Sequence, residues 1–481
     1  MSIRGNSCKK RKVTNVNFGS VLMNEVNLII IGAGPGGYET AVKAAKAGLK
    51  TVIIEKAALG GTCLNAGCIP TKCLCHSAEV HDEVLAAGYD DAAVDIAALV
   101  ARKDSVVEKL RQGVAMLMKM PGITLVEGEA RFVDAHTVAV RKADGEEEQF
   151  VAPNVIIATG SVTKFLPIPG AHAQGVITST EALNLTTLPK RLCIIGGGVI
   201  GMEFASIFRS FGVEVEVVEF MKEILPAFDR DIAKRLRTSL KKRGIGFHVG
   251  AAAKAIYEGE PMRVEFEEKG KLQSLECDLV LMAVGRGANL EAINLDDIGV
   301  AYTRRGITVD QDMQTNVPGV YAIGDVNGLC QLAHAATFQG YCALHHILSS
   351  SVPDTATDGC ENPYHAALTV IPAAVFTTPE AAMVGQTEEQ LTEAGTEYKA
   401  LKSFYRANGK ALSMDADDGL VKILVAPAGK ILGAHILGAH ASDLIHEVTV
   451  VMRQGGTIHD IAHTVHTHPS LSEILLAAAE A

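Results

Sequence analysis

The sequence LIIIGAGPGG at residues 28–37 is the stretch that decides the fold. Its apolar half predicts a buried strand, and the turn is followed by a helical run (Tyr38–Ala47), a second strand (Thr51–Ile54) and the acid Glu55. The turn contains three glycines at the spacing of a dinucleotide-binding loop: Gly32, Gly34 and Gly37. Such glycines allow a tight turn, close approach of the backbone to a pyrophosphate, and close packing of helix on strand. The stretch therefore predicts a nucleotide-binding β-α-β unit in which Glu55 accepts a hydrogen bond from a ribose hydroxyl.

The same design recurs later in the chain. An apolar strand (Leu192–Ile195), a helical run (Met202–Phe211) and a further strand (Glu214–Val218) enclose a second turn and end at Glu219. The second turn repeats the glycine spacing: Gly196, Gly198 and Gly201. Two complete units predict two bound dinucleotides. Because the Glu219 carboxylate would repel a 2′-phosphate, we expect the second dinucleotide to be NAD rather than NADP.

The composition excludes several classes of protein. A length of 481 residues, at about 150 residues per domain, suggests roughly three domains. The net charge of −11, without a long basic stripe, argues against binding to nucleic acid. The sequence has no apolar run long enough to span a membrane and no signal-peptide pattern, so we expect a cytoplasmic location. We expect residues 1–23 to form a disordered extension that the fold does not need.

A pair of cysteines follows the first unit directly, in the sequence GGTCLNAGCIPTK at residues 60–72. Cys63 and Cys68 are separated by four residues and can close a small disulfide loop. Since such a short loop contributes little to stability, the pair points to redox chemistry beside a nucleotide. Pro70 favours a helix start, whose dipole would stabilise the Cys68 thiolate. The other cysteines lack metal-site spacing, so no metal site is predicted.

The cysteine motif and the C-terminal sequence HTHPSLSE, at residues 466–473, together resemble the pyridine nucleotide–disulfide oxidoreductases. The run CIPTK is most similar to the dihydrolipoamide dehydrogenase branch, and the resemblance extends from about Val26 to Glu473. It implies an α/β fold with two doubly wound Rossmann-like nucleotide-binding domains and a C-terminal α+β dimerisation domain. It also implies non-covalent FAD, NAD and a homodimer.

The resemblance also implies domain limits. Residues 24–150 and 285–361 are expected to form the two parts of the FAD-binding domain, residues 151–284 the NAD-binding domain, and residues 362–481 the interface domain. The sequence departs from the family pattern at three positions: Ala288, Ala336 and Gln339. These changes leave the cysteines and the C-terminal motif intact.

Catalytic roles follow from the same resemblance. Cys63 is implied to exchange with the substrate, and Cys68 to lie nearer the flavin. His468 is implied to be the acid–base catalyst, oriented by Glu473 and completing the site of the partner subunit. This assignment is chemically reasonable, because disulfide exchange needs a base and an imidazole titrates near neutral pH. Without the cysteine motif, the histidines of this region would equally suit a metal site or an exposed surface.

The remaining expected contacts surround the two cofactors. Lys72 and Glu203 match a family ion pair near the flavin N5 and the nicotinamide, although a surface salt bridge is the alternative. The other residues implied to contact FAD are Thr62, Ala130, Thr159, Gly160, Ser161, Asp325, Gln331, Leu332, Ala333 and His334. Those implied to contact NAD, besides the second unit, are Ala255 and Gly285.

The implied reaction is the oxidation of protein-bound dihydrolipoyl groups by NAD⁺. The expected partner is a lipoylated acyltransferase or the lipoylated carrier of glycine cleavage. Two alternatives remain open at the level of the sequence. One is a related reductase acting on another disulfide, a metal ion or a quinone, and the other is a non-catalytic FAD-binding protein.

Overall fold

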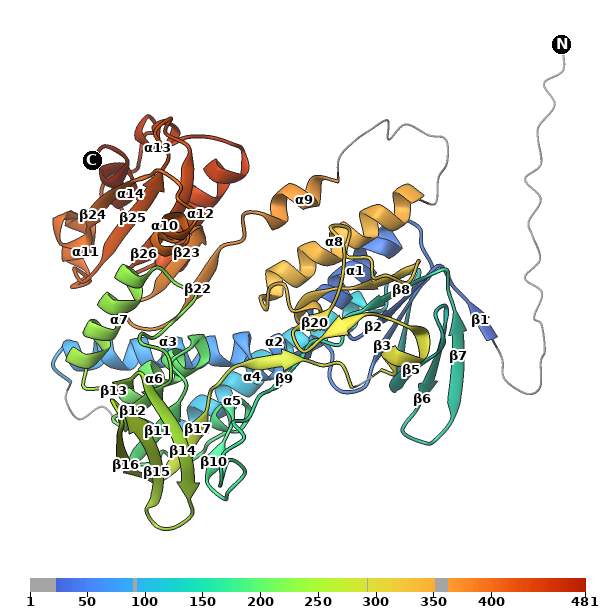
Figure 1. Ribbon diagram of the computed structural model, residues 1–481, viewed down its shortest axis with the longest axis horizontal. Helices are drawn as coiled ribbons and strands as arrows, with labels where there is room; N and C mark the ends of the chain where they lie inside the picture. The colour runs from blue at the N-terminus through green and yellow to red at the C-terminus, as the bar shows by residue number, and fades with distance from the viewer. Residues whose placement is uncertain (1–22, 90–92, 292, 351–361) are drawn as a thin grey trace.

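The computed structural model describes residues 23–89, 93–291, 293–350 and 362–481 (Figure 1). Except for Met23, the predicted N-terminal extension lies outside the described residues, as does 351–361 at the end of the expected FAD-binding domain. Three large sheets organise the described chain. No helix within these ranges is long and apolar enough to cross a membrane.

The first sheet contains five parallel strands built around the decisive stretch. In spatial order they are β21 (Val320–Ala322), β8 (Asn154–Ile157), β2 (Leu28–Ile31), β3 (Thr51–Glu55) and β4 (Ile123–Glu127). All four residues of β2 are buried, as expected for a parallel strand covered on both faces. The strand β8 lies between β2 and β21, whereas the expected domain limits grouped residues 154–157 with the second nucleotide unit. Its backbone is paired on both sides and Val155, Ile156 and Ile157 are fully buried, as expected for a central parallel strand covered on both faces.

Helices and a smaller sheet complete this unit. The helices are α1 (Pro35–Lys46), α2 (Gly61–Ala66), α3 (Cys68–Ala86), α4 (Ile96–Leu117) and α8 (Ala333–Ser350). The smaller sheet has the order β1 (Met23–Glu25), β7 (Glu147–Val151), β6 (Thr137–Arg141) and β5 (Glu129–Asp134). This part of the chain also contains two antiparallel strand pairs, β9 (Ser161–Thr163) with β18 (Arg286–Ala288) and β19 (Tyr302–Thr303) with β20 (Gly306–Ile307). Two 3₁₀ turns are η1 (Leu295–Ile298) and η2 (Gly324–Asn327).

The second sheet repeats the parallel design. Its order is β10 (Val176–Ile177), β17 (Leu279–Met282), β11 (Arg191–Ile195), β12 (Glu214–Glu219) and β13 (Gly246–Val249). An antiparallel sheet of β14 (Ala251–Tyr257), β15 (Met262–Glu268) and β16 (Lys271–Cys277) accompanies it. The helices of this unit are α5 (Ser179–Ala182), α6 (Val199–Ser210) and α7 (Arg230–Lys242).

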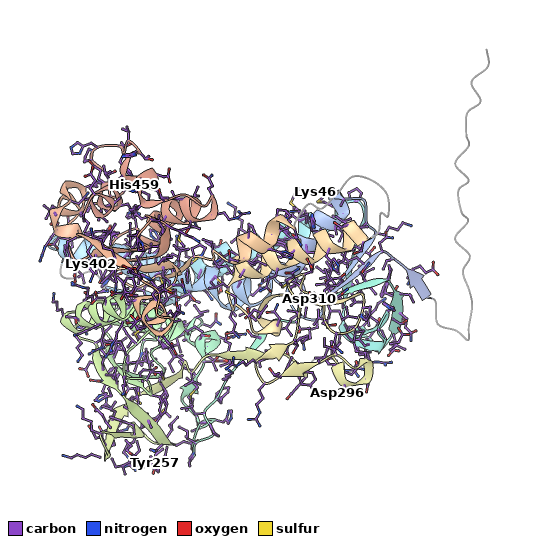
Figure 2. All side chains as sticks on the ribbon, turned by 45° about the horizontal axis from the view of Figure 1, so that its top comes forward. Lys46, Tyr257, Asp296, Asp310, Lys402 and His459 are labelled. Carbon is purple, nitrogen blue, oxygen red and sulfur yellow. The ribbon has the colours of Figure 1, made fainter. Side chains whose placement is uncertain are left out.

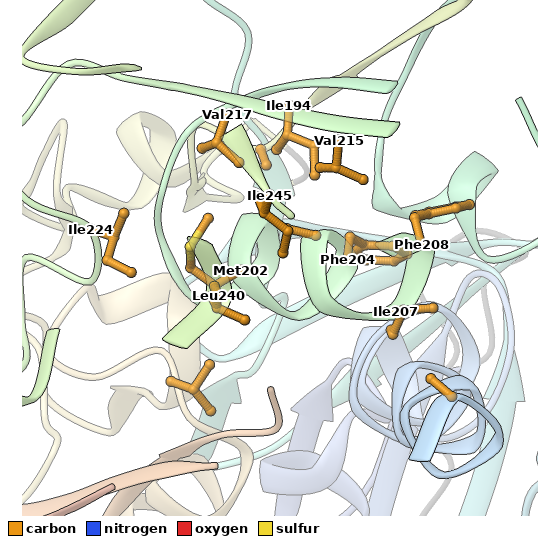
Figure 3. Packing of buried hydrophobic residues seen from close by; sticks show 14 of the residues in the cluster. Ile194, Met202, Phe204, Ile207, Phe208, Val215, Val217, Ile224, Leu240 and Ile245 are labelled. Atoms are coloured by element: carbon orange, nitrogen blue, oxygen red, sulfur yellow. The ribbon is translucent and has the colours of Figure 1, made fainter. Parts of the chain in front are cut away.

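The core of the second unit forms between its sheet and α6 (Figure 3). Met202 and Phe204 of α6 lie in one buried cluster with Ile194, Val215 and Val217 from the adjacent strands. Each such side chain, once fully buried, contributes about 1.5–3 kcal/mol to the free energy of folding. The helix α3 packs along α6, so the helix that begins at the second cysteine connects the two nucleotide units.

The C-terminal part is an antiparallel sheet covered by short helices, and it stands apart from the first sheet in Figure 1. The strand order is β22 (Ala373–Val375), β23 (Ala381–Gly385), β26 (Ile431–Leu437), β25 (Leu420–Val425) and β24 (Lys399–Phe404). Its helices are α9 (Pro363–Leu368), α10 (Glu388–Glu393), α11 (Gly409–Ser413), α12 (Ala441–Arg453), α13 (Ile458–Ala462) and α14 (Glu473–Ala479), with η3 at Tyr405–Ala407. The predicted fold class, two doubly wound units followed by an α+β unit, is therefore confirmed.

Candidate active site

One cavity of about 1880 Å³ connects the features that the sequence singled out. Both glycine turns, the cysteine segment and the ends of several strands line it. In a parallel α/β sheet, ligands bind at the carboxyl ends of the strands. The cavity lies at that edge of both parallel sheets, so a single space serves the two nucleotide units.

The first glycine of each turn is required by the backbone. Gly32 has φ +107° and Gly196 has φ +114°, values that residues with a side chain rarely adopt. A Cβ atom on Gly32 would lie 2.4 Å from the carbonyl oxygen of Ala158, and one on Gly196 would lie 2.3 Å from that of Ala283. The two turns therefore share one geometry, and each brings its strand end against the next strand.

The third glycine of each turn acts in packing. A Cβ atom on Gly37 would lie 2.0 Å from the carbonyl oxygen of Gly32, and one on Gly201 would lie 2.0 Å from that of Gly196. Gly201 does not line the cavity, although we expected it to contact the cofactor. Its place at the helix–strand contact accounts for this difference, because the third glycine of the motif serves close packing.

The two acids close their turns in the same way. Glu55 accepts a hydrogen bond of 2.8 Å from the N–H of Ala33, and Glu219 accepts one from the N–H of Gly197. Each carboxylate also accepts a hydrogen bond from the N–H two residues after it, at 2.9 Å and 2.5 Å respectively. Both acids line the cavity, where their remaining lone pairs can receive a ribose hydroxyl.

The cysteine pair lies on the cavity wall, where α2 meets α3. Cys63 belongs to α2 and Cys68 is the first residue of α3, and the two free thiols are hydrogen-bonded to each other. This hydrogen bond, together with burial, raises the pKa of Cys63 far above its usual range. The same hydrogen bond, opposed by burial and assisted by Lys72, lowers the pKa of Cys68 to about 7. The reduced pair therefore holds its negative charge on Cys68.

The predicted ion pair beside the cysteines is formed. Lys72 Nζ donates to the two carboxylate oxygens of Glu203 at 2.9 Å and 3.0 Å. Burial lowers the pKa of Lys72, but the Glu203 carboxylate outweighs this effect and the pKa is raised. Glu203 also accepts from the N–H of Phe376 at 3.0 Å, and Lys72 Nζ lies 4.4 Å from the Phe376 ring. The ammonium group is thus held protonated in the cavity wall.

An arginine that the sequence analysis missed completes another part of the wall. Ser161 Oγ donates to Asp325 at 2.6 Å, and Arg286 Nε donates to Ser161 Oγ at 2.8 Å. A second guanidinium nitrogen of Arg286 donates to the Ser161 carbonyl oxygen at 2.6 Å. The signal was present in the sequence, because Arg286 follows the predicted site residue Gly285 at the end of an apolar strand.

Most of the other expected cofactor contacts line the cavity: Gly34, Thr62, Ala130, Thr159, Gly160, Gln331, Leu332, Ala333 and His334. Ala255 does not line the cavity, whereas the three residues 251–253 do, and its contact with NAD stays a prediction. They open β14, and its register shifts between Ala253 and Ala255. Since a strand rises about 3.3 Å per residue, Ala255 lies further along the strand, away from the cavity.

All three departures from the family pattern have structural partners. Gln339 is buried and its side-chain oxygen accepts from the N–H of Gly324 at 2.7 Å and from Asn327 Nδ2 at 2.9 Å. Ala336 lies against Gly36, where a Cβ atom on the glycine would approach the Ala336 carbonyl oxygen at 3.0 Å. These residues hold the turn before Asp325 against the first glycine helix. Ala288 pairs with Ser161 between β18 and β9.

The pair of His468 and Glu473 forms as expected, but it lies outside the cavity that the cysteines line. His468 Nδ1 is 2.9 Å from Glu473, whose other oxygen accepts from the N–H of Ser470 at 2.8 Å. These two hydrogen bonds, that of Ser470 first, lower the pKa of Glu473. The His468 side chain is 82% exposed and does not line the cavity, so within one chain it is not brought to the cysteines. Figure 1 shows α14, which begins at Glu473, well separated from α2.

Comparison with known proteins agrees with this geometry. Residues 26–340 match the family model for pyridine nucleotide-disulphide oxidoreductases, and residues 371–479 match the dimerisation domain of the same family. A dihydrolipoyl dehydrogenase of Bacillus subtilis is 40% identical over 465 residues, covering 95% of this chain and 96% of the relative. The Cu(II) complex of the HOCl-induced flavoprotein disulfide reductase RclA from Escherichia coli has a TM-score of 0.82 and 32% identity, covering 95% and 99% of the two chains. LpdA from Mycobacterium tuberculosis has a TM-score of 0.84 and 27% identity, with the same coverage.

Proposed function

The chain belongs to the pyridine nucleotide–disulphide oxidoreductase family, and from this premise we propose that it is a dihydrolipoyl dehydrogenase that uses FAD and NAD⁺. One observation carries the proposal. The Cys63–Cys68 pair lies on the wall of a cavity that is also lined by two dinucleotide turns. This arrangement suits electron transfer from a dithiol, through a flavin, to a nicotinamide.

The residues of the first unit fit FAD. The turn at Gly32 admits no side chain, and the following helix α1 begins at Pro35, so its first N–H groups are available to a pyrophosphate. Glu55 faces the cavity for a ribose hydroxyl. Bound FAD supplies the two-electron chemistry that links thiols to a nicotinamide. The second unit has the same features, and its acid Glu219 favours NAD over NADP.

The chain's own side chains control protons and charge at this site. Cys68 carries the thiolate in the reduced pair, stabilised by its hydrogen bond from Cys63 and by the Lys72 ammonium. Cys63 has a raised pKa, so a base must remove its proton before it can attack a substrate disulfide. In the opposite direction, the same base can take the proton of an incoming dithiol. Glu203 keeps Lys72 charged and fixed in place.

We propose that this base is His468 of the partner subunit in a homodimer. Within one chain His468 is exposed, lies outside the cavity that the cysteines line, and is hydrogen-bonded through Nδ1 to Glu473. This leaves Nε2 as the nitrogen that can accept a proton from a thiol. The dimerisation domain supplies the means to place it at a second chain.

The physiological electron donor is proposed to be the dihydrolipoyl group of a lipoylated acyltransferase or of the lipoylated glycine-cleavage carrier. The relatives named dihydrolipoyl dehydrogenase support the lipoyl substrate class. A cytoplasmic location stays a prediction.

The experiment that tests the proposal compares substrates on the purified FAD-loaded enzyme. We expect rapid NAD⁺ reduction with dihydrolipoamide, at least about tenfold slower reduction with NADP⁺, and little oxidation of NADH by glutathione disulfide. Turnover with glutathione disulfide but not with lipoamide would instead identify a related disulfide reductase. A protein that binds no FAD would contradict the proposal altogether.

A further inference from the structure

A second cluster of chemically reactive side chains lies outside the active site. Asp312, Cys342 and His365 each offer one ligand atom, and the three atoms lie within 4.8 Å of one another. His365 Nε2 and Asp312 Oδ1 are 2.8 Å apart. None of the three residues lines the active-site cavity. Figure 2 labels Asp310, two residues before Asp312, in the part of the molecule that holds the first sheet.

The three ligand atoms come from different elements. Asp312 lies in the loop between β20 and β21, Cys342 in α8, and His365 in α9. Cys342 is fully buried, whereas the side chains of Asp312 and His365 are 20% and 19% exposed. The cluster therefore has a closed side, formed by the sulfur, and an open side through which an ion can enter.

The donor set is that of a zinc site. Thiolate, imidazole and carboxylate bind Zn²⁺ at about 2.3 Å, 2.0–2.1 Å and 2.0–2.2 Å, so neighbouring ligand atoms of a tetrahedron lie about 3.3–3.6 Å apart. The separations in the cluster, 2.8 Å between His365 Nε2 and Asp312 Oδ1 and at most 4.8 Å for the others, bracket this range. Three protein ligands leave the fourth position for water.

We propose that Asp312, Cys342 and His365 form a Zn²⁺-binding site that joins α8 to α9. Binding exchanges the Cys342 thiol proton, released to solvent, for a zinc–sulfur bond, and no oxidant or reductant is needed. Asn362 already directs Nδ2 to Cys342 Sγ at 3.3 Å and to Asp312 Oδ1 at 3.1 Å, which is the place of an outer ligand-orienting group. Since α8 begins at the active-site wall and α9 leads to the C-terminal sheet, the ion would fasten the connection between them.

In the other cluster of potential ligand atoms in the described part of the chain, a lysine already takes the place of a metal ion. Asp229, Asp231 and Glu388 also bring their carboxylates within 4.8 Å. Lys422 Nζ already lies among them, 2.8 Å from Asp229 and hydrogen-bonded to Glu388. That ammonium group takes the position of a cation. Among the described residues, no lysine or arginine is hydrogen-bonded to Asp312. Cys342 Sγ donates to the Gln311 carbonyl oxygen at 3.4 Å and His365 Nε2 pairs with Asp312, so an ion would replace these two hydrogen bonds and no fixed cation.

The test uses the oxidised, FAD-loaded enzyme, in which a Cys63–Cys68 disulfide does not compete for metal. After removal of metal by a chelator, Zn²⁺ uptake is measured by metal analysis. Co²⁺ uptake is followed by the d–d absorption of a tetrahedral ion, at wavelengths beyond the flavin bands. We expect one ion per chain, and an affinity at least about 100-fold lower in Cys342→Ser and in His365→Gln. Asn362→Ala, in the outer group, should lower the affinity by about 10–100-fold.

His463→Ala is the matched control. His459 and His463 form a stacked, exposed pair with ring centroids 6.2 Å apart, labelled in part in Figure 2, and could bind zinc adventitiously. We expect this variant to bind zinc like the wild type. If Cys342→Ser does not fold, as judged by its flavin absorption, His365→Gln and X-ray absorption of the wild type decide, with one sulfur expected at about 2.3 Å. Absence of uptake, uptake that survives loss of the ligands, or uptake lost in His463→Ala would overturn the proposal.

Discussion

The described residues include two pairs of hydrogen-bonded thiols in very different places. Cys63 and Cys68 lie on the active-site cavity, near Lys72. Cys193 of β11 and Cys277 of β16 are each only 1% exposed and lie in an apolar cluster behind the second sheet. In both pairs the hydrogen bond raises the pKa of one thiol and lowers that of the other. Pairing alone therefore does not make a redox centre.

What distinguishes the first pair is access and a nearby fixed cation. The Lys72 ammonium, held by Glu203, helps to lower the pKa of Cys68, and the pair opens to a space large enough for two dinucleotides. The pKa of Cys277 is lowered mainly by its hydrogen bond with Cys193, against burial and the Asp278 carboxylate, and no lysine contributes as Lys72 does at Cys68. The second pair consequently behaves as small apolar residues in a core.

The largest expected difference is in turnover. Cys63→Ser should lower lipoamide turnover on the order of 10³-fold or more, because the exchanging sulfur is lost. Cys193→Ser, the matched control in the buried pair, should change kcat by less than about twofold. Steady-state assays with dihydrolipoamide and NAD⁺, at equal FAD content, check both. Comparable losses in the two variants would remove the distinction between the pairs.

The next effect concerns the base. His468→Gln should lower kcat by about 10²–10⁴-fold, the range typical of a lost acid–base catalyst. The flavin content should stay unchanged, because the side chain is exposed and lies outside the cavity of its own chain. Mixed dimers of His468→Gln and Cys63→Ser chains test the subunit arrangement. If His468 serves the partner's cysteines, a mixed dimer retains one intact site and measurable activity; inactive mixed dimers would contradict this arrangement.

A smaller effect is expected in the pH dependence of the reduced pair. The Cys68 thiolate exists above its pKa of about 7 and is protonated below it, so its long-wavelength charge-transfer absorption with the flavin should disappear as the pH falls through this value. Lys72→Met removes a cation and should raise the midpoint by about 1–3 pH units. Spectra of the two-electron-reduced enzyme measure the midpoint directly. An unchanged midpoint would mean that Lys72 does not stabilise this thiolate.

The sequence was sufficient to predict the features that depend on short motifs. Both glycine turns and their acids lie where the motifs predicted them, and the Lys72–Glu203 pair forms as the family resemblance implied. Local spacing pointed to the position of Arg286, next to Gly285, but not to its contacts, which depend on β18 pairing with β9. It also did not indicate the cluster of Asp312, Cys342 and His365, whose members are separated by 30 and 23 positions in the chain. Nor did it indicate that residues 251–253, rather than Ala255, line the cavity, because the register shift in β14 is set by pairing between strands. Contacts that arise only from tertiary pairing leave little trace in a single sequence.

The smallest expected effect is the loss of a buried thiol. Cys193→Ala should lower the free energy of unfolding by about 1 kcal/mol, because a small buried group is removed from a packed cluster. Denaturant titration measures this change, while turnover and flavin spectrum should match the wild type. In the reduced native enzyme a thiol reagent should modify the cavity pair and leave Cys193 and Cys277 unmodified until unfolding. Rapid modification of the buried pair under native conditions would show that access does not separate the two pairs, and the explanation based on exposure and charge would then fail.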